Sequence, residues 1–167
     1  MNTSKNSYIC KDEKGNVLLS IENINENELS KNSLLTHCLA VVKLGNDYVL
    51  GWNKWRNRYE IFGGCIENGE SARECILREC CEELGLKDAD MTYLGAMKLL
   101  LKSDYFSSDE RIEYGGLYGI SLPDTTIEDI NSQIKDKDEI GTISFYNQIK
   151  NTQPIAAIDE KLLEYFV

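Results

Sequence analysis

Three glutamates on one predicted helix carry the strongest chemical signal in the chain: Glu79, Glu82 and Glu83. On a helical wheel that starts at Ala72, they fall at roughly 340°, 280° and 20°. Carboxylates on adjacent turns repel one another, and only Arg78 supplies a positive charge near this edge. A bound cation would explain the cluster, because Mg²⁺ and similar hard divalent ions take oxygen ligands and bind together with phosphate oxygens.

The element that positions these carboxylates is a helix expected to begin after Ser71 and to end at Gly85. Ser71 and Glu74 form a capping box, and a glycine is suited to the position that follows the last turn. The larger apolar side chains of the helix are Ile76, Leu77, Cys80, Cys81 and Leu84. They fall between roughly 40° and 180° on the wheel, so the acidic edge borders a face that packs on a core.

The stretch Gly64 to Leu86 resembles the Nudix box. Its matching fixed residues are Gly64, Glu70, Arg78, Glu79, Glu82, Glu83 and Gly85, at the spacings of that family. Cys80 departs from the family pattern, because it stands where a bulky aliphatic residue is usual. Phe62 departs as well, because it precedes the glycine pair where proline is frequent.

The resemblance implies an α/β (α+β) fold of the Nudix type, an α/β/α sandwich with a central mixed sheet. The predicted order of strands, one strong helix, more strands and a terminal helix agrees with that class. Strands are predicted at Leu34–Leu44, Tyr48–Trp52, Tyr59–Phe62, Met91–Lys102, Ile112–Leu122 and Gly141–Tyr146. Pro123 is expected to end the fifth of these, a short helical turn is expected within 124–139, and a C-terminal helix at about Ala157–Phe166.

Residues 1–33 are expected to form a segment ahead of the main domain, which spans 34–167. Residues 7–22 are typical of a hairpin, and the polar stretch 22–33 is interpreted as a linker or surface loop. Two roles stay open for this part of the chain: an appended edge of the sheet, or a contact in a homodimer.

The resemblance also implies an activity, the hydrolysis of a nucleoside diphosphate linked to another group, with Mg²⁺ (or Mn²⁺) as cofactor. The metal ligands that it implies are the Gly64 carbonyl and the carboxylates of Glu79, Glu82 and Glu83. Arg78 would pair with Glu70 or with Glu79 and fix the rotamer of that carboxylate. The general base varies within the family, and the candidates here are Glu82 and Glu139.

Candidates for substrate binding lie just upstream of the box, where Lys54, Arg56 and Arg58 form a basic stretch in an acidic chain. They are suited to substrate phosphates, and a solvated loop is the alternative. His37 lies in an apolar strand and is interpreted as a core histidine. Aromatic side chains that could stack on a base, or pack in the core, are Trp52, Trp55, Tyr59, Phe62, Tyr105, Phe106, Tyr114 and Tyr118.

Composition narrows the class of protein. The chain has 167 residues, of which 42% are hydrophobic and 28% charged, values typical of one globular domain. A formal charge of -10 argues against binding along a nucleic-acid backbone but not against a nucleotide, since a bound metal reverses the local sign. We expect no membrane segment, no signal peptide and, with six cysteines and one histidine, no zinc site. Reduced thiols and a cytoplasmic location follow.

The box predicts the reaction but not the leaving group. The sequence favours a nucleoside triphosphate pyrophosphohydrolase that removes oxidised nucleotides of the 8-oxo-dGTP type. Hydrolysis of ADP-ribose, a nucleotide sugar or a dinucleoside polyphosphate is the alternative, as is a nucleotide-binding module without turnover. Isopentenyl diphosphate isomerases share the fold but need several histidines, which makes that activity a poor match. The expected partner is a small-molecule nucleotide.

Overall fold

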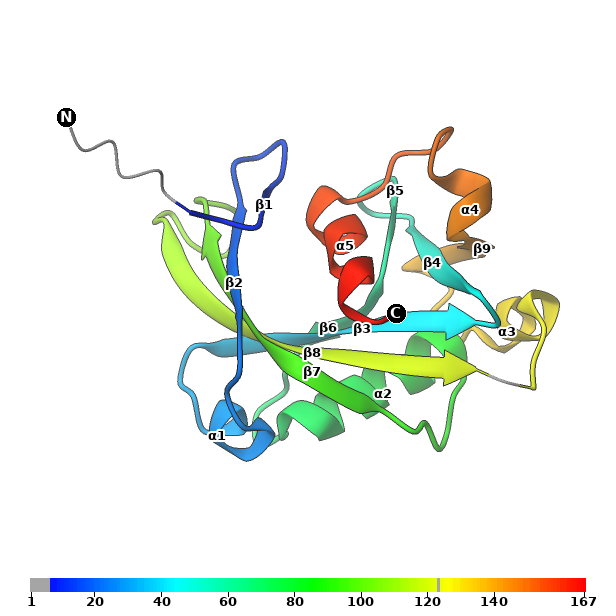
Figure 1. Ribbon diagram of the computed structural model, residues 1–167, viewed down its shortest axis with the longest axis horizontal. Coiled ribbons are helices and arrows are strands. Elements are labelled where there is room, and N and C mark those ends of the chain that lie inside the picture. The colour runs from blue at the N-terminus through cyan, green and yellow to red at the C-terminus, as the bar shows by residue number, and fades with distance from the viewer. Residues whose placement is uncertain (1–6, 123) are drawn as a thin grey trace.

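A nine-stranded mixed sheet forms the centre of the computed structural model, which describes residues 7–122 and 124–167 (Figure 1). The strands are β1 (Cys10–Lys11), β2 (Val17–Glu22), β3 (Leu35–Leu44), β4 (Asp47–Asn53), β5 (Arg58–Glu60), β6 (Phe62–Cys65), β7 (Thr92–Leu101), β8 (Arg111–Leu122) and β9 (Ile140–Phe145). Their order is β1-β2-β7-β8-β3-β4-β5, with β6 paired to β3 and β9 to β4. β3 and β8 run parallel, so the predicted mixed sheet is confirmed.

Helices cover both faces of this sheet. They are α1 (Glu26–Ser30), α2 (Ala72–Leu84), α3 (Ile127–Gln133), α4 (Tyr146–Ile149) and α5 (Ala157–Leu162), which continues into a 3-10 turn, Leu163–Tyr165. α1 and α2 lie on one face and α5 on the other (Figure 1). A separate apolar core fills each side, one containing Ile76 of α2 and the other Leu162 of α5. The predicted sandwich is therefore confirmed.

The N-terminal hairpin belongs to the sheet, because β2 pairs antiparallel with β7 along most of its length. The hairpin turn is closed by Asp12, whose carboxylate accepts from the backbone N–H groups of Lys14 and Asn16. The polar stretch 22–33 differs from the loop that was expected, since it contains α1. Asn25 caps that helix and Leu29 is fully buried, so one apolar residue in a polar stretch anchors the segment to the core.

The remaining differences from the predicted elements are small. The six predicted strands agree with β3 to β9 within a few residues, except that the single strand expected at Tyr59–Phe62 is divided into β5 and β6. α3 supplies the helical turn expected within 124–139. The C-terminal helix is shorter than predicted, because its last turn tightens into the 3-10 turn. Pro123, which was expected to end β8, lies outside the described residues, as do residues 1–6.

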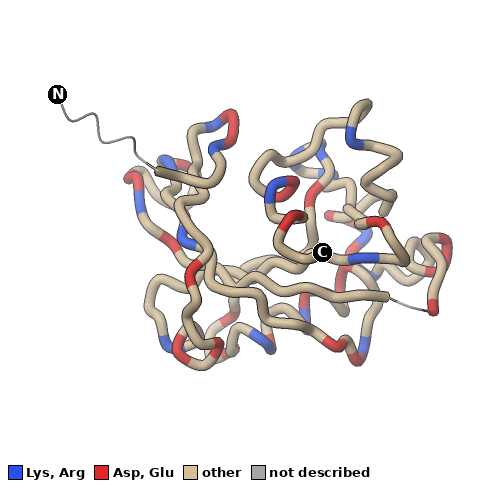
Figure 2. Tube along the Cα trace, viewed as in Figure 1, with Lys and Arg blue, Asp and Glu red and all other residues tan. Residues whose placement is uncertain are grey.

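Two general features of the described chain are the distribution of its charged residues and the length of its helices. Lys and Arg positions are interspersed with Asp and Glu positions along the described chain (Figure 2). Within 7–122 and 124–167, no helix is long and apolar enough to cross a membrane.

Candidate functional site

Helix α2 begins and ends where the sequence predicts. The Ser71 hydroxyl accepts a hydrogen bond from the Glu74 N–H and donates one to the Glu74 carboxylate, which closes the first turn. Gly85 ends the helix in the left-handed region, with φ 70. The apolar face is buried as expected, and the carboxylates of Glu79 and Glu83, one turn apart, are buried with it. The sequence therefore places two acidic side chains inside the molecule.

A pair of glycines in β6 makes room for these carboxylates. A Cβ at Gly64 would lie 2.4 Å from Oε1 of Glu79, so this position accepts no side chain while the carboxylate is in place. Gly63 has φ +140, and its backbone N–H donates to Oε2 of Glu83 over 3.3 Å. The predicted ligands Glu79 and Glu83 therefore both pack against the glycine pair, Glu79 at Gly64 and Glu83 at Gly63. Glu82 lies on the same helix edge, with its side chain 47% exposed.

Arg78 joins the carboxylates of this helix edge to the loop before it. Its guanidinium donates to both oxygens of Glu70, at 2.7 and 3.0 Å, in the bidentate geometry that arginine favours. It also donates to Oε1 of Glu79 at 2.8 Å and to the Cys65 carbonyl at 2.9 Å, and lies 3.6 Å from Glu82. The expected pairing with Glu70 or Glu79 thus involves both residues.

Burial disfavours the charged form of the Glu79 and Glu83 carboxylates. It raises the pKa of Glu83 well above its usual value, and the nearby charges of Glu79 and Glu139 raise it further. Burial also raises the pKa of Glu79, although the Arg78 guanidinium acts in the opposite direction. The pKa of Glu70 is lowered instead, because its carboxylate is held by Arg78. Two buried acids with raised pKa values mark a place where additional positive charge would be stabilising.

The donor set suits a hard divalent cation. It consists of carboxylate oxygens and a backbone carbonyl, the ligands that Mg²⁺ and Mn²⁺ take. Across 7–122 and 124–167, no three His, Cys, Asp or Glu side chains already converge on one point that could hold a metal ion. Glu79 is instead directed to Arg78, whose guanidinium supplies the positive charge in this conformation. The residues fit a cation if Glu79 turns from Arg78 to the ion.

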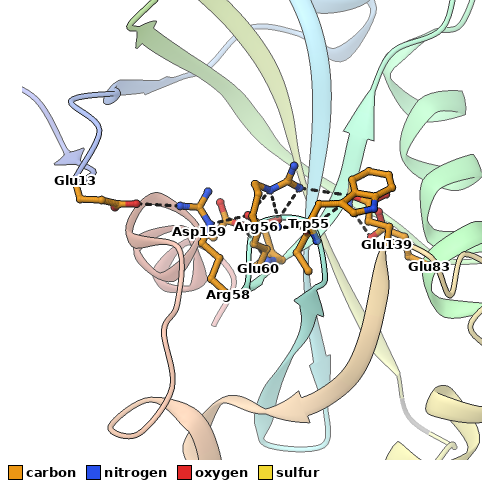
Figure 3. Close-up of polar contacts among 11 residues, drawn as sticks. Glu13, Trp55, Arg56, Arg58, Glu60, Glu83, Glu139 and Asp159 are labelled. Atoms are coloured by element: carbon orange, nitrogen blue, oxygen red, sulfur yellow. Dashed lines mark hydrogen bonds and ion pairs between the residues drawn. The ribbon is translucent and has the colours of Figure 1, made fainter. Parts of the chain in front are cut away.

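Glu139, the second candidate for the general base, lies near these carboxylates. Asn53 of β4 donates to its Oε1 over 3.1 Å, and the guanidinium of Arg56 lies 3.6 Å from that oxygen. Burial raises the pKa of Glu139, while Arg56 lowers it. In Figure 3, Glu139 and Glu83 lie next to each other, although they come from different parts of the chain.

A cavity of about 550 Å³ opens beside these acids. Arg56 and Arg58 line it, and both are held by Glu60: Arg56 through contacts of 2.7 to 3.0 Å and Arg58 at 2.8 Å. Arg58 also reaches Glu13 in the N-terminal hairpin, at 3.2 Å (Figure 3). Lys54, the third basic candidate, is not among the lining residues; its ammonium donates to the Lys137 carbonyl.

Several polar residues of the cavity were not singled out by the sequence. Asp159 of α5 accepts from the Ile61 N–H at 3.0 Å, and burial raises its pKa to about 7, with Glu60 adding to the effect. Thr36, His37 and Glu113 line the same cavity. His37 was expected in the core, and it is partly exposed toward this space. No local motif marks these positions, because three different elements, β3, β8 and α5, bring them together.

The aromatic candidates separate into packing residues and residues near the cavity. Phe62 is fully buried, and the hydroxyl of the buried Tyr118 donates to Glu26. Phe106 lines the cavity although 84% of it is exposed, and Trp55 is 63% exposed near Glu139 (Figure 3). Phe106 stands at the rim of the cavity and Trp55 beside Glu139, where they could contact a flat ligand.

Comparison with known proteins identifies a family match over most of the chain. A family model described as a NUDIX domain matches residues 38–166. One curated relative is the putative 8-oxo-dGTP diphosphatase YtkD of Bacillus subtilis (strain 168), 34% identical over 83 residues. That alignment covers 46% of this chain and 52% of YtkD, so the match spans about half the length of the relative.

Solved structures share the fold at low sequence identity. The pyrophosphohydrolase BsRppH of Bacillus subtilis is 19% identical with a TM-score of 0.60, over 89% of this chain and 85% of that one. A MutT NUDIX hydrolase from Burkholderia pseudomallei is 16% identical, with a TM-score of 0.59, over 80% and 98% of the two chains. The NUDIX domain of Shewanella oneidensis NrtR, solved with ADP ribose, has a TM-score of 0.59 at 16% identity, over 86% and 91%.

Proposed function

This chain belongs to the NUDIX family, and we propose that it hydrolyses a phosphoanhydride bond in a nucleoside diphosphate linked to another group, with Mg²⁺ (or Mn²⁺). The observation that carries the proposal is the pair of buried carboxylates, Glu79 and Glu83, packed against the glycines of β6, where Glu83 lines the cavity. Burying two like charges costs free energy unless a positive charge joins them. A phosphate-binding cation is the partner that suits their oxygens.

Glu79, Glu82, Glu83 and the Gly64 carbonyl would hold this ion. When bound, such a cation neutralises the charge on phosphate oxygens and lowers the pKa of a water molecule. Arg78 positions the carboxylates, because it grips Glu70 with two hydrogen bonds and reaches Glu79 with a third nitrogen. Loss of Arg78 would therefore loosen two acidic side chains at once.

Glu139 and Glu82 are the candidates to take a proton from the attacking water. Burial raises the pKa of Glu139, which brings a carboxylate nearer to the value that suits a general base at neutral pH. Asn53 and Arg56 both approach Oε1 of Glu139, which leaves Oε2 for the proton. Glu82 is more exposed, and its distance of 3.6 Å from Arg78 ties it to the ion-binding edge.

Substrate phosphates would be bound by the basic residues upstream of the box. Arg56 and Arg58 already face the cavity, and a phosphate would compete with Glu60 for their guanidinium groups. Lys54 would join them only after leaving the Lys137 carbonyl, so we expect it to contribute least.

The substrate that we favour is an oxidised nucleoside triphosphate of the 8-oxo-dGTP type, cleaved to a monophosphate and pyrophosphate. The name of the Bacillus subtilis relative supports this choice. We place the protein in the cytoplasm, because its six cysteines are free thiols. Two of them, Cys75 and Cys80, are fully buried in the core around α2. A homodimer remains a prediction.

A nucleotide panel tests the proposed function. Pyrophosphate and phosphate release would be measured with Mg²⁺ and with a chelator in place of Mg²⁺, for 8-oxo-dGTP, dNTPs, ADP-ribose, diadenosine polyphosphates and nucleotide sugars. We expect turnover that requires the metal, is fastest with 8-oxo-dGTP, and falls strongly in the Glu82→Gln variant. Glu128→Gln is the matched control, since it removes one exposed carboxylate on α3. Equal, slow release by wild type and Glu82→Gln for every nucleotide would refute a hydrolase.

A further inference from the structure

A β-bulge brings Thr36 and His37 to the same cavity. The pairing of β3 with β8 shifts by one residue between Leu35 and His37, so Thr36 is the extra residue. Neighbouring residues of a regular strand point to opposite faces, and a bulge removes this alternation. Thr36 and His37 both line the cavity as a result.

The hydrogen bonds of Thr36 determine which nitrogen of His37 carries the proton. The hydroxyl lies 2.7 Å from Oε2 of Glu113, which as a carboxylate only accepts, so the hydroxyl proton is used there. The same hydroxyl lies 2.9 Å from Nδ1 of His37 and must accept from it. His37 is therefore the tautomer that is protonated on Nδ1, and its Nε2 carries a lone pair.

Two further contacts hold this arrangement. The second oxygen of Glu113 accepts from Nε of Arg111 at 2.8 Å, and Arg111 is also bound to Asp104 at 3.1 Å. Burial lowers the pKa of His37, against the opposing charge of Glu113, which favours the neutral imidazole at neutral pH. The ring is thus a fixed acceptor in the pocket wall.

Nε2 of His37 is left for a ligand. The hydrogen bond of the ring to Thr36 uses Nδ1, and no buried side-chain nitrogen or oxygen of the described residues lacks a partner, so Nε2 is open to the cavity. Gly115 of β8 provides the space, because a Cβ there would lie 2.8 Å from Nε2. This contact gives a physical reason for glycine at position 115.

The imidazole of His37 lies close to the part of the cavity that Gly64 and Glu83 line. His37 is paired with Cys65, the residue that follows Gly64, and neighbouring strands are about 4.8 Å apart. Apolar side chains from Leu39, Leu99 and Leu101 line the cavity as well. A base lying on this apolar surface would present its edge to the imidazole.

We propose that His37, fixed by Thr36 and Glu113 with an unprotonated Nε2, determines specificity by accepting a hydrogen bond from an N–H group of the base. This inference rests on the proposed function, because it assigns the base to this cavity. It favours 8-oxopurine nucleotides, since N7 of an 8-oxopurine carries a proton whereas N7 of the parent purine carries a lone pair. Two lone pairs facing each other leave both acceptors unsatisfied, which we expect to disfavour the parent purine about 10- to 100-fold.

The tautomer is measured directly by ¹⁵N NMR. The chain has a single histidine, so its two ring nitrogens are assigned without ambiguity. Wild type is expected to show the proton on Nδ1. In Glu113→Gln the amide oxygen has to face the Arg111 donor and the NH₂ group has to face Thr36, so the Thr36 proton turns to His37 and the imidazole proton moves to Nε2. A wild-type spectrum with the proton on Nε2 would overturn the inference.

Specificity is measured as the ratio of kcat/KM for 8-oxo-dGTP to kcat/KM for dGTP. Glu113→Gln is expected to lower this ratio about 10- to 100-fold, because the reversed imidazole donates to N7 of dGTP. Thr36→Val, which keeps the shape but removes the hydroxyl, is expected to move the ratio toward one. Thr36→Ser keeps the hydroxyl and is the matched control with an unchanged ratio. An unchanged ratio in Glu113→Gln and Thr36→Val contradicts the role of His37.

Failure of the proposed function would be recognised separately. If wild type turned over no nucleotide of the panel, the hydrolase assignment would fail, and 8-oxo-dGMP and dGMP would then be titrated into ¹⁵N-labelled protein. A change of the Nε2 resonance with 8-oxo-dGMP that exceeds the change with dGMP supports the inference without any turnover. No change with 8-oxo-dGMP overturns it.

Discussion

The acidic edge of α2 and the wall of the cavity meet at one place but are built in opposite ways. The edge comes from one continuous stretch, 64–86, in which a helix sets the spacing of Glu79 and Glu83. The wall is assembled from separate strands and a helix, and includes Thr36, Glu113 and Asp159. The reaction chemistry is therefore encoded locally, whereas recognition depends on the order of strands in the sheet.

The two regions also differ in how their charges are balanced. In the wall, Glu60 is held by two arginines and Glu113 by Arg111. On the helix, Arg78 serves several carboxylates, while among the described residues the buried Glu83 accepts only from the Gly63 N–H. These two wall carboxylates are thus paired with arginines, whereas the helix edge has an excess of negative charge that a cation would balance.

The largest expected effect comes from neutralising that excess. Glu83→Gln keeps an acceptor for the Gly63 N–H but removes a buried charge, so the metal-free Tm should stay or rise. Loss of a ligand should lower kcat by at least about 100-fold, since even outer partners of metal ligands cost 10- to 100-fold. Thermal unfolding and steady-state kinetics check both parts. A variant with normal kcat would show that Glu83 is structural.

The glycine pair offers a steric version of the same test. In Gly64→Ala the new Cβ would lie 2.4 Å from Oε1 of Glu79 and should displace that carboxylate, lowering kcat about 10- to 100-fold. Gly69→Ala is the control, because nothing lies within 4 Å of its Cβ position. At φ +84 it should lose about 1–2 kcal/mol of stability and keep its kcat. Equal kinetics of the two variants would contradict a close packing of Glu79 on β6.

A third effect is the dependence of stability on pH that we expect from Asp159 in the cavity wall. Burial raises the pKa of Asp159 from its ordinary value of 3.8 to about 7, so the folded state binds more protons than the unfolded chain between these values. Stability should therefore be highest below pH 4 for this group and fall as the pH rises to 7. Asp159→Asn keeps an acceptor for Ile61 and should gain about 1–3 kcal/mol over wild type at pH 8, with little difference at pH 4.

Chemical denaturation of both proteins at several pH values measures this difference. Parallel curves of wild type and Asp159→Asn between pH 4 and pH 8 would mean that Asp159 ionises in the folded protein as it does in the unfolded chain.

The smallest effect is expected where the wall reaches the surface. The Arg58–Glu13 contact involves a Glu13 side chain that is 64% exposed, and such pairs contribute little. Glu13→Gln should change the free energy of unfolding by less than about 0.5 kcal/mol. Urea denaturation and KM for the nucleotide check this, and a several-fold rise in KM would show that the hairpin positions Arg58 for substrate.

The contrast between the regions explains what the sequence could predict. The helix from Ser71 to Gly85, its buried stripe and the Arg78 contacts follow from local spacing, and the structure has them. Glu139 was expected from its place just before a strand, and β9 brings it beside Glu83 (Figure 3).

The missed features depend on contacts that are distant in sequence. His37 was interpreted as a core residue, because an apolar strand with one histidine gives no sign of the bulge at Thr36. Asp159 is one acid among several in the terminal helix, and no sequence pattern predicts that α5 places it against the backbone N–H of Ile61. α1 was not predicted within the polar stretch 22–33, because one buried leucine, Leu29, does not form a periodic apolar pattern.

The central claim is that the buried acids of α2 bind a divalent cation, and Mn²⁺ binding tests it without a choice of substrate. The bound fraction would be followed by electron paramagnetic resonance for wild type, Glu83→Gln and the control Glu128→Gln. We predict saturable binding to wild type and to the control, weakened at least about tenfold in Glu83→Gln. Equal affinity of all three proteins for Mn²⁺ would contradict the account.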